Sequence, residues 1–482
     1  MSYEVVIGLE VHVELHTQSK LFCACPNRFV PDPNVNTCSV CLGFPGALPR
    51  LNSEAVSLAL LASLALNCEI ASISYFDRKN YFYPDMPKGY QISQYFEPIG
   101  RNGHIDIEDD RGELKRICIG RVHMEEDAGK LVHSLAGDAS MVDYNRAGVP
   151  LIEIVTEPDL RSSGEARRYL EKLKGILEYV RVSDCKMEEG SLRCDANISL
   201  RPMGSTILGS KTELKNMNSF KAVEKSLEHE IRRQKKILDS GSHVITQTLR
   251  WDDNSQQTIA MRGKLQAHDY RCFTDPELAP IELTEAEIEK ARSSLPEMAE
   301  ARACRFVKEY GLPDYDARVL TASRSMADYF ENCLKLYDNP KLVSNWVMGE
   351  LTARLNSTGL DIEQCAFLPD HLAELLNMVD ENVISGKIAK DVLDKSFEKG
   401  KSPRQVVEDE GLLQISDQSE LETVIDVVIA GNPESVDNYL GGKTKAIGFL
   451  VGQVMKETRG KANPQLVNEL LVKKLQEQQS QH

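Results

Sequence analysis

The chain has 482 residues, of which 41% are hydrophobic and 27% charged, and its formal net charge is −16. It is too long for one ordinary core, so we expect two to four domains. No apolar run reaches transmembrane length, and no basic segment with an apolar run opens the sequence, so we expect no signal peptide and a cytoplasmic protein. The negative charge argues against nucleic-acid binding by the molecule as a whole.

The first predicted element is a β-strand over residues 5–15, in which apolar and polar residues alternate. Its apolar face carries Val5, Ile7, Leu9, Val11, Val13 and Leu15. Its other face carries Gly8, Glu10, His12 and Glu14. Two carboxylates and an imidazole in one row are ligand types for a divalent cation. Because Glu14 lies nearest the end of the strand, we assign it to structure or solvent.

Four of the twelve cysteines are clustered, as Cys23, Cys25, Cys38 and Cys41. Two close pairs joined by a turn-rich loop are typical of a four-thiolate zinc site. Unrelated thiols or disulfides are the alternatives, but the other eight cysteines are scattered, as in reduced proteins. We therefore predict a structural zinc knuckle at residues 23–41, with no open position for a substrate water.

A helix follows over residues 53–66, with Ser53 as its predicted cap. Residues 76–90 combine aromatic residues, lysines and prolines without a clear period, which predicts a long ordered loop. Lys79, Lys88 and the tyrosines of this loop could contact phosphate and a base or ribose. Aromatic packing with solvated lysines explains the composition equally well.

Two later strands carry acidic residues. The strand over 115–126 ends near Glu125 and Glu126, which are either an exposed turn or, if this strand pairs with the first, neighbours of Glu10 and His12. Glu153 lies within an apolar strand, where an unpaired carboxylate would be costly, so we favour a metal or substrate role for it.

A helix over residues 163–182 precedes a strand that places Arg193, Asp195 and Asn197 on one face. This face is either solvated or half of a polar site. A short strand after residue 211 and a helix capped by Ser219 complete the pattern. Together these elements predict an α+β domain on a largely antiparallel sheet, ending near residue 290.

Strand patterns fade after residue 295. Helices are predicted at 296–310, 317–337, 342–356, 369–381 and 386–399, and a smaller bundle at 418–430, 433–440, 444–458 and 464–479. Between residues 441 and 482, seven lysines and arginines face three glutamates, a net charge of +4. This basic tail fits either an RNA contact or a solvated helix surface.

Familiar nucleotide-binding and nucleophile motifs are missing from the sequence. Gly442-Lys443-Thr444 resembles the end of a P-loop, but Asp437 stands where that motif needs glycine. No Rossmann glycine pattern follows a strand, and no serine or cysteine lies in a recognisable nucleophile motif. Any use of ATP would therefore rely on metal-bridged phosphates held by carboxylates.

Long segments of the sequence do resemble one family, the B subunits of tRNA-dependent amidotransferases. The similar segments are residues 7–15, 76–94, 123–130, 150–159, 186–200 and 442–470. This resemblance implies a glutamine-synthetase-like cradle domain at 1–292, an all-α helical domain at 293–404 and a small α-helical, tRNA-binding tail domain at 405–482. It also implies an ATP- and Mg²⁺-dependent ligase that amidates Glu-tRNA(Gln), Asp-tRNA(Asn) or both, in a heterotrimer with an amidase (glutaminase) subunit and a small third subunit.

The resemblance also implies roles for individual residues. Glu10, His12 and Glu125 would bind Mg²⁺, with Glu153 as a further catalytic candidate. The nucleotide and phosphate candidates are Lys79, Arg193, Asp195, Asn197 and Lys215. The tRNA candidates in the tail are Lys443, Lys445, Lys456, Arg459 and Lys461. Two other functions are consistent with the sequence: a zinc-containing tRNA-binding scaffold without catalysis, and a free-standing carboxylate–amine ligase for a small molecule.

Overall fold

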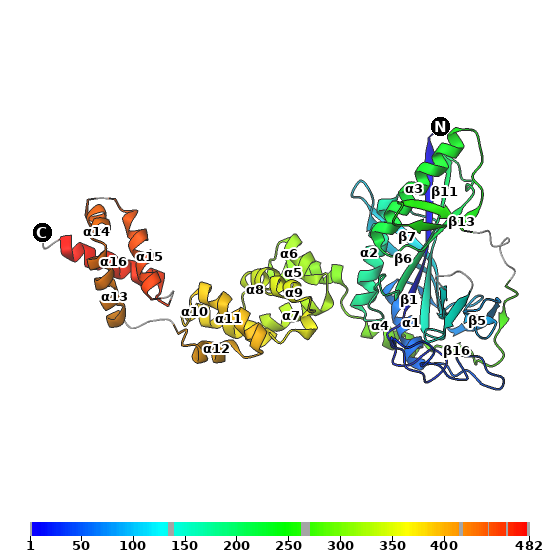
Figure 1. Cartoon of the computed structure of the whole chain (residues 1–482), viewed down its shortest axis with the longest axis horizontal. Coiled ribbons are helices and arrows are strands. Elements are labelled where there is room, and N and C mark those ends of the chain that lie inside the picture. The colour runs from blue at the N-terminus through cyan, green and yellow to red at the C-terminus, as the bar shows by residue number, and fades with distance from the viewer. Residues whose placement is uncertain are drawn as a thin grey trace. The chain divides into compact units, whose positions relative to one another are not determined.

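A computed structural model of the chain describes residues 2–133, 139–261, 270–413, 418–441, 443–458 and 461–479. The chain divides into two compact units, Met1–Met298 and Ala299–His482 (Figure 1). In the described part of the chain, no helix combines the length and the apolar character needed to cross a membrane.

The first unit is built on a 12-stranded sheet. Its main path runs in the order β14 (Gln257–Ala260), β13 (Gln247–Asp252), β12 (Thr212–Lys215), β11 (Leu192–Pro202), β1 (Tyr3–Glu14), β10 (Pro150–Thr156), β7 (Leu114–Glu126), β5 (Tyr90–Ser93), β4 (Asp77–Asn80) and β15 (Phe273–Thr274). Off this path, β6 (Gly100–Glu108) pairs with β7 and with β2 (Glu69–Ile70). Neighbouring strands are antiparallel, except that β12 and β13 are parallel, so the sheet is largely antiparallel, as predicted.

Two short strand pairs lie outside this sheet. β3 (Ile73–Ser74) pairs with β16 (Ile281–Glu282), and β8 (Lys130–His133) pairs with β9 (Ser140–Asp143). Together with the helices, these strands make the first unit α+β, which confirms the predicted class.

The alternation in β1 sets the two faces of the sheet. Ile7, Leu9, Val11 and Val13 are each at most 1% exposed. They share one core with apolar residues of α1 (Ser53–Ala65), α2 (Ser163–Tyr179) and α3 (Phe220–Asp239), and α2 and α3 lie beside the sheet in Figure 1. The helices therefore cover the apolar face of β1, and its polar residues project from the opposite face.

The register of the strands places polar residues of β11, β1, β10 and β7 side by side. His12 of β1 is opposite Glu153 of β10 on one side and Arg193 of β11 on the other. Glu153 is in turn opposite His123 of β7. Four polar residues from four neighbouring strands thus form one row across the sheet.

Two local predictions for the first unit need correction. Ser53 is the first residue of α1 rather than its cap, because the Asn52 side chain accepts hydrogen bonds from the N–H groups of Glu54 and Ala55. The segment 76–90 is not loop throughout, since its two ends form the paired strands β4 and β5 and only the residues between them form a loop. By contrast, Ser219 caps α3 as predicted.

The second unit is helical and follows α4 (Glu285–Ser294) along the chain. Its first helices are α5 (Ala299–Tyr310), α6 (Asp314–Thr321), α7 (Arg324–Leu334), α8 (Pro340–Trp346), α9 (Thr352–Thr358), α10 (Pro369–Asp380), α11 (Gly386–Lys399) and α12 (Pro403–Asp409). Then come α13 (Gln418–Gly431), α14 (Pro433–Leu440), α15 (Ala446–Glu457) and α16 (Pro464–Gln479).

Two hydrophobic clusters form within this unit, one from buried residues between 303 and 407 and one from buried residues between 421 and 475. Two predicted helices are interrupted. The segment 317–337 breaks between α6 and α7, and the segment 342–356 contains a π-helical turn, Val347–Leu351, between α8 and α9.

Candidate functional site

His12 and Glu153 of this row, together with Glu125, which lies two residues beyond His123 on β7, come within ligand distance of one another. His12 Nε2 lies 3.4 Å from Glu125 Oε1 and 3.6 Å from Glu153 Oε2. One ligand atom from each of the three lies within 4.8 Å of the others. His123 adds a second imidazole, whose Nε2 is 3.0 Å from Glu153 Oε2. Oxygen and imidazole donors at these spacings suit a divalent cation, which His12, Glu125 and Glu153 would hold.

Electrostatics at this group show that the side chains compensate one another's charges. Burial disfavours protonated His123, but Glu153 and Glu125 outweigh it and raise its pKa to about 9. His12 behaves in the same way, with its pKa raised by the same carboxylates against burial. Conversely, the two histidines overcome the effect of burial on Glu153 and lower its pKa to about 2. The buried carboxylates therefore stay ionised and require positive charge beside them.

Glu10 lies next along the same face but outside the three-residue ligand group. Its Oε1 accepts a hydrogen bond of 2.8 Å from Asn197 Nδ2. Burial and the Glu153 charge raise the pKa of Glu10. Glu10 and Asn197 line a cavity of about 290 Å³ together with Lys211, Gly8 and Gly209.

A second cavity, of about 310 Å³, opens directly onto the ligand group. Its lining residues are His12, Lys79, Tyr81, Met86, Gln91, Glu125, Asp127, Ala128, Leu151, Arg193, Asp195 and Tyr270. Lys79 projects over the ring of Tyr270, with Nζ 4.9 Å from the ring centroid. Lysine and arginine side chains beside a metal-ligand group can bind the oxygens of a phosphorylated substrate.

The sequence-predicted nucleotide residues are divided between these cavities. Lys79, Arg193 and Asp195 line the larger of the two, whereas Asn197 lines the one beside Glu10. Lys215 lines neither cavity, but its ammonium forms an ion pair with Asp195.

Two residues of this candidate site, His123 and Asp127, were not predicted from the sequence. His123 lies two residues before Glu125 on the same strand, so alternation places both on one face and could have identified it. Asp127 is buried and receives two hydrogen bonds from the Arg193 guanidinium, at 2.9 and 3.2 Å. No sequence pattern pairs Asp127 with Arg193, because the contact links residues 66 positions apart.

The four clustered cysteines meet in space as predicted from their spacing. Their sulfur atoms lie within 4.8 Å of one another, and Cys41 Sγ is 3.8 Å from Cys38 Sγ. A hydrogen bond from the Cys23 thiol, together with the Cys38 backbone N–H and nearby Lys20, lowers the pKa of Cys41 to about 5. Four converging sulfurs fit a tetrahedral thiolate site for a soft or borderline cation such as zinc.

The basic residues of the tail lie mainly on its surface. Lys443, Lys445 and Lys456 are exposed, and Lys461 is half-buried. Arg459 lies outside the described residues. An exposed charged surface of this kind suits a polyanion.

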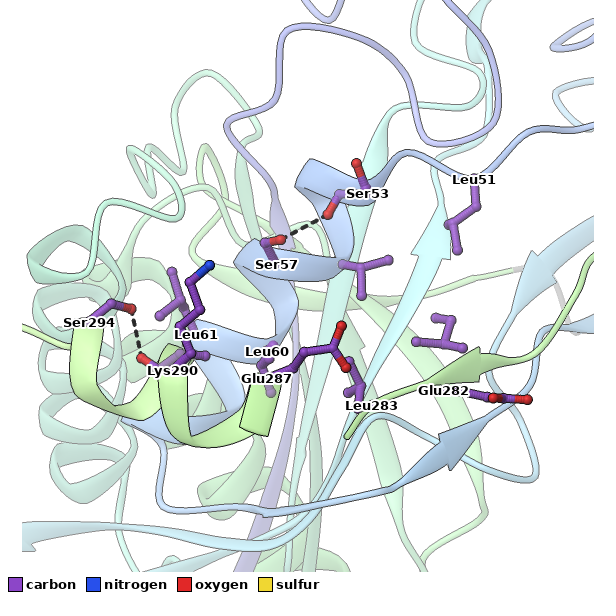
Figure 2. A pocket seen from close by; sticks show the side chains of 13 residues that line it. Leu51, Ser53, Ser57, Leu60, Leu61, Glu282, Leu283, Glu287, Lys290 and Ser294 are labelled. Carbon is purple, nitrogen blue, oxygen red and sulfur yellow. Dashed lines mark hydrogen bonds between the residues drawn. The ribbon is translucent and has the colours of Figure 1, made fainter. Parts of the chain in front are cut away.

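A larger cavity of the first unit, about 530 Å³, is separate from the ligand group. Figure 2 shows it between α1, α4 and β16, with Leu60, Leu61 and Leu283 among its lining residues. Its surface is mainly apolar, and none of its lining residues belongs to a ligand group in the described part of the chain. This cavity therefore does not provide the chemistry of the His12 site.

Comparisons with known proteins place the chain among its relatives. Residues 5–289 match the GatB/GatE catalytic domain and residues 328–475 match the GatB domain. The chain is 58% identical over 475 residues to the B subunit of the aspartyl/glutamyl-tRNA(Asn/Gln) amidotransferase of Caldanaerobacter subterraneus subsp. tengcongensis, covering 98% of this chain and 100% of the relative. The corresponding B subunits of Carboxydothermus hydrogenoformans and Geobacter sulfurreducens are 56% and 54% identical, over 98% of this chain and 99% and 100% of their own lengths.

The two domain matches reach into both units, and the first of them spans every strand that carries the ligand group. The full-length relatives cover the same strands and the helical unit together. The chain therefore belongs to the family of aspartyl/glutamyl-tRNA(Asn/Gln) amidotransferase B subunits, and it is a subunit of a ligase-type amidotransferase.

Proposed function

We propose that this subunit activates the side-chain carboxylate of tRNA-bound glutamate, aspartate or both by phosphorylation with ATP, so that ammonia can convert it to the amide. The observation that carries the proposal is the group formed by His12, Glu125 and Glu153, of which His12 and Glu125 line a cavity together with Lys79 and Arg193. Phosphoryl transfer requires metal ligands next to positively charged side chains that can bind phosphate oxygens.

The chemistry explains why ATP is needed. Ammonia cannot displace an oxide ion from a carboxylate at a useful rate. An oxygen of the side-chain carboxylate instead attacks the γ-phosphorus of ATP, which releases ADP and forms an acyl phosphate. Ammonia then attacks the carbonyl carbon, inorganic phosphate leaves with the C–O bonding electrons, and the nitrogen loses a proton to give the neutral amide.

Each residue of the site has a task in this scheme. Mg²⁺, when bound by the ligand group, would neutralise charge on the transferring phosphoryl group. Glu10 completes the acidic wall from the same strand. Lys79 and Arg193 bind phosphate oxygens, and Asp127 holds the Arg193 guanidinium in a fixed orientation through two hydrogen bonds. Asp195 and Asn197 bind the nucleotide, with Lys215 held beside them by Asp195.

The domain arrangement follows the same proposal. Residues 1–292 form a glutamine-synthetase-like cradle that holds the reaction site, and residues 293–404 form a helical domain. Residues 405–482 form a tail domain that binds tRNA through Lys443, Lys445, Lys456, Arg459 and Lys461. The exposure of three of these lysines supports this role.

Ammonia must come from a partner. The sequence has no recognisable glutaminase nucleophile, and the relatives are named as B subunits, a designation that belongs to a larger enzyme. We therefore propose a heterotrimer with an amidase subunit and a small third subunit, in which ammonia reaches the His12 site without entering bulk solvent.

We also propose that the four cysteines bind structural zinc, with no catalytic role. The convergence of their sulfur atoms supports this proposal. Metal analysis of the purified complex should find one zinc per chain in the wild type and clear loss of zinc in Cys38→Ser. Equal zinc content in both proteins would exclude the site.

ATP cleavage by the purified complex, with and without Glu-tRNA(Gln) or Asp-tRNA(Asn), tests the main proposal. We expect cleavage that depends on the misacylated tRNA. A tRNA-binding scaffold predicts no cleavage under any condition, and a free-standing ligase predicts cleavage with a small-molecule carboxylate in the absence of tRNA. Either result would contradict the proposal.

A further inference from the structure

A buried lysine, Lys20, contacts the cysteine cluster. Lys20 is 0% exposed. Its ammonium donates a 2.8 Å hydrogen bond to the carbonyl oxygen of Asn36 and lies 3.9 Å from Cys41 Sγ. Burying an ammonium group is costly unless a negative charge lies beside it. Four thiolates around a divalent cation leave a net charge of −2, which supplies that partner.

Two hydrogen bonds tie this cluster to a nearby segment of the chain. The Leu21 N–H, directly after Lys20, donates to the Gly148 carbonyl oxygen at 2.8 Å. The Asn36 N–H donates to Asn145 Oδ1, also at 2.8 Å. Lys20 therefore adjoins both tethers: the first is made by the residue that follows it, and the second by Asn36, whose carbonyl oxygen its side chain binds.

The same segment supports the reaction site. The Gly148 N–H donates to the Asp127 carbonyl oxygen, and the Asp127 N–H donates to the Val149 carbonyl oxygen, each at 2.9 Å. Asp127 in turn binds Arg193 at the cavity wall. Gly148 has a φ of +86°, and a Cβ there would lie 3.5 Å from Cys41 Cβ and 3.6 Å from Lys20 Cδ. The turn that holds Asp127 is thus built directly against the cysteine cluster and the stem of Lys20.

We propose that Lys20 is a positioning residue that couples the four-cysteine cluster to the reaction site, because its ammonium compensates the thiolate charge and its hydrogen bonds fix the segment that holds Asp127 against Arg193. This inference rests on the proposed zinc site and on the proposed function. Lys20 lines neither of the cavities beside the ligand group, so it acts through the orientation of Arg193.

Zinc retention provides the first test. In the purified complex, Lys20→Met removes the ammonium and keeps an unbranched apolar side chain of similar length. We expect a 10- to 100-fold loss of zinc affinity, measured by competition with a chromogenic chelator, because residues that support metal ligands typically contribute that much. Lys115→Met is the matched control, since Lys115 pairs with Glu165 in the same unit, away from the cluster. Zinc affinity equal to that of the wild type in Lys20→Met would overturn the proposal.

Hydrogen exchange provides the second test and needs neither ATP nor tRNA. We expect faster exchange in peptides covering residues 144–151 of Lys20→Met, with exchange in α2 unchanged. Faster exchange throughout the first unit would indicate general destabilisation and would contradict a positioning role.

A second variant, Lys20→Gln, separates the effect of the charge from that of the hydrogen bond. It also keeps the proposal testable if Lys20→Met does not fold. Lys20→Gln keeps an N–H donor for Asn36 without the charge, so we expect weakened zinc binding but exchange at 144–151 closer to the wild type. Zinc binding as tight as in the wild type would overturn the charge role. If the wild type itself binds no zinc, the zinc proposal fails and the role of Lys20 fails with it. If zinc binds and the Lys20 variants behave as expected but ATP is never cleaved, the proposed function fails while the coupling of Lys20 to residues 144–151 stands.

Discussion

At the scale of single residues, the candidate site depends on charges that the 12-residue strand β1 holds in fixed register. Glu10 and His12 can be predicted from the alternation in residues 5–15, because a strand with one buried face has only one way to direct its polar side chains. The Asp127–Arg193 pair cannot be predicted in this way. It depends on a turn after one strand meeting the side chain of another, and this contact is set by the packing of the whole sheet.

Glu10→Gln tests the acidic wall of the site. We expect at least a 100-fold loss of tRNA-dependent ATP cleavage with glutamine hydrolysis by the partner retained, since the loss of one charge-stabilising group typically costs about 10²–10³ in rate. Glu4→Gln is the matched control, because Glu4 lies on the same strand and pairs with Arg201 away from the cavity. Normal ATP cleavage in Glu10→Gln would exclude Glu10 from the site.

The raised pKa of His123 predicts a pH-dependent stability of the metal-free protein. Its pKa rises from an ordinary 6.5 to about 9 in the folded state. Protonated His123 therefore stabilises the fold fully below pH 6.5, and this contribution is lost as pH rises through 9. A shift of this size corresponds to on the order of 3 kcal/mol.

Denaturant unfolding of EDTA-treated protein between about pH 6.5 and 9.5 measures this effect. We expect the free energy of unfolding to decline over that range in the wild type and to change much less in His123→Gln. The same decline in both proteins would assign the pH dependence to other groups.

At the scale of elements, long segments with a regular side-chain period are predicted well, whereas short segments without such a period are not. Alternation in β11 puts the face opposite Arg193, Asp195 and Asn197 in the core, and its five residues are all buried: Leu192, Cys194, Ala196, Ile198 and Leu200. The strands β4 and β5 escape prediction, because each has four residues without a useful period and their pairing depends on neighbours in the sheet. Similarly, the parallel pairing of β12 with β13 involves residues on either side of α3, and no local pattern reveals it.

Asn52→Ala tests the cap of α1. The Asn52 side chain accepts from two N–H groups of the helix and donates to the Ser19 carbonyl oxygen at 3.1 Å. We expect a loss of about 1–2 kcal/mol in the free energy of unfolding. Ser53→Ala, one residue later, should change it by less than about 0.5 kcal/mol, because an exposed helix position contributes little. Similar losses from the two substitutions, measured by denaturant titration, would contradict the assignment of the cap.

At the scale of the whole molecule, length predicts several domains, and composition gives a net negative charge. The structure adds which residues form each separate core. The hydrophobic cluster at 303–407 includes Val406 and Val407 of α12, so these residues pack with the preceding helices. The cluster at 421–475 contains only later residues. Side-chain periods do not show that α12 packs with the earlier helices, because an amphipathic pattern does not say which neighbour a helix contacts.

Removal of residues 418–482 tests the role of the tail while leaving α12 intact. We expect the KM for misacylated tRNA to rise at least about tenfold, since each lost lysine–phosphate contact weakens binding. Zinc content and Mg²⁺ binding should be unchanged, because both candidate sites lie in the first unit. Loss of metal binding together with tRNA use would contradict the assignment of these tasks to separate regions.

The central place of β1 has a consequence for how the protein is made. β1 pairs with β10 and β11, which begin at Pro150 and Leu192, far along the chain from Glu14. At a synthesis rate of about 5–20 residues per second, the ribosome needs roughly 10–40 s to deliver both partners. Until β11 is made, at least one edge of β1 lacks its partner, and α3, which contributes to the core on its apolar face, is made later still. Chaperone binding to this segment would therefore govern the yield of folded protein.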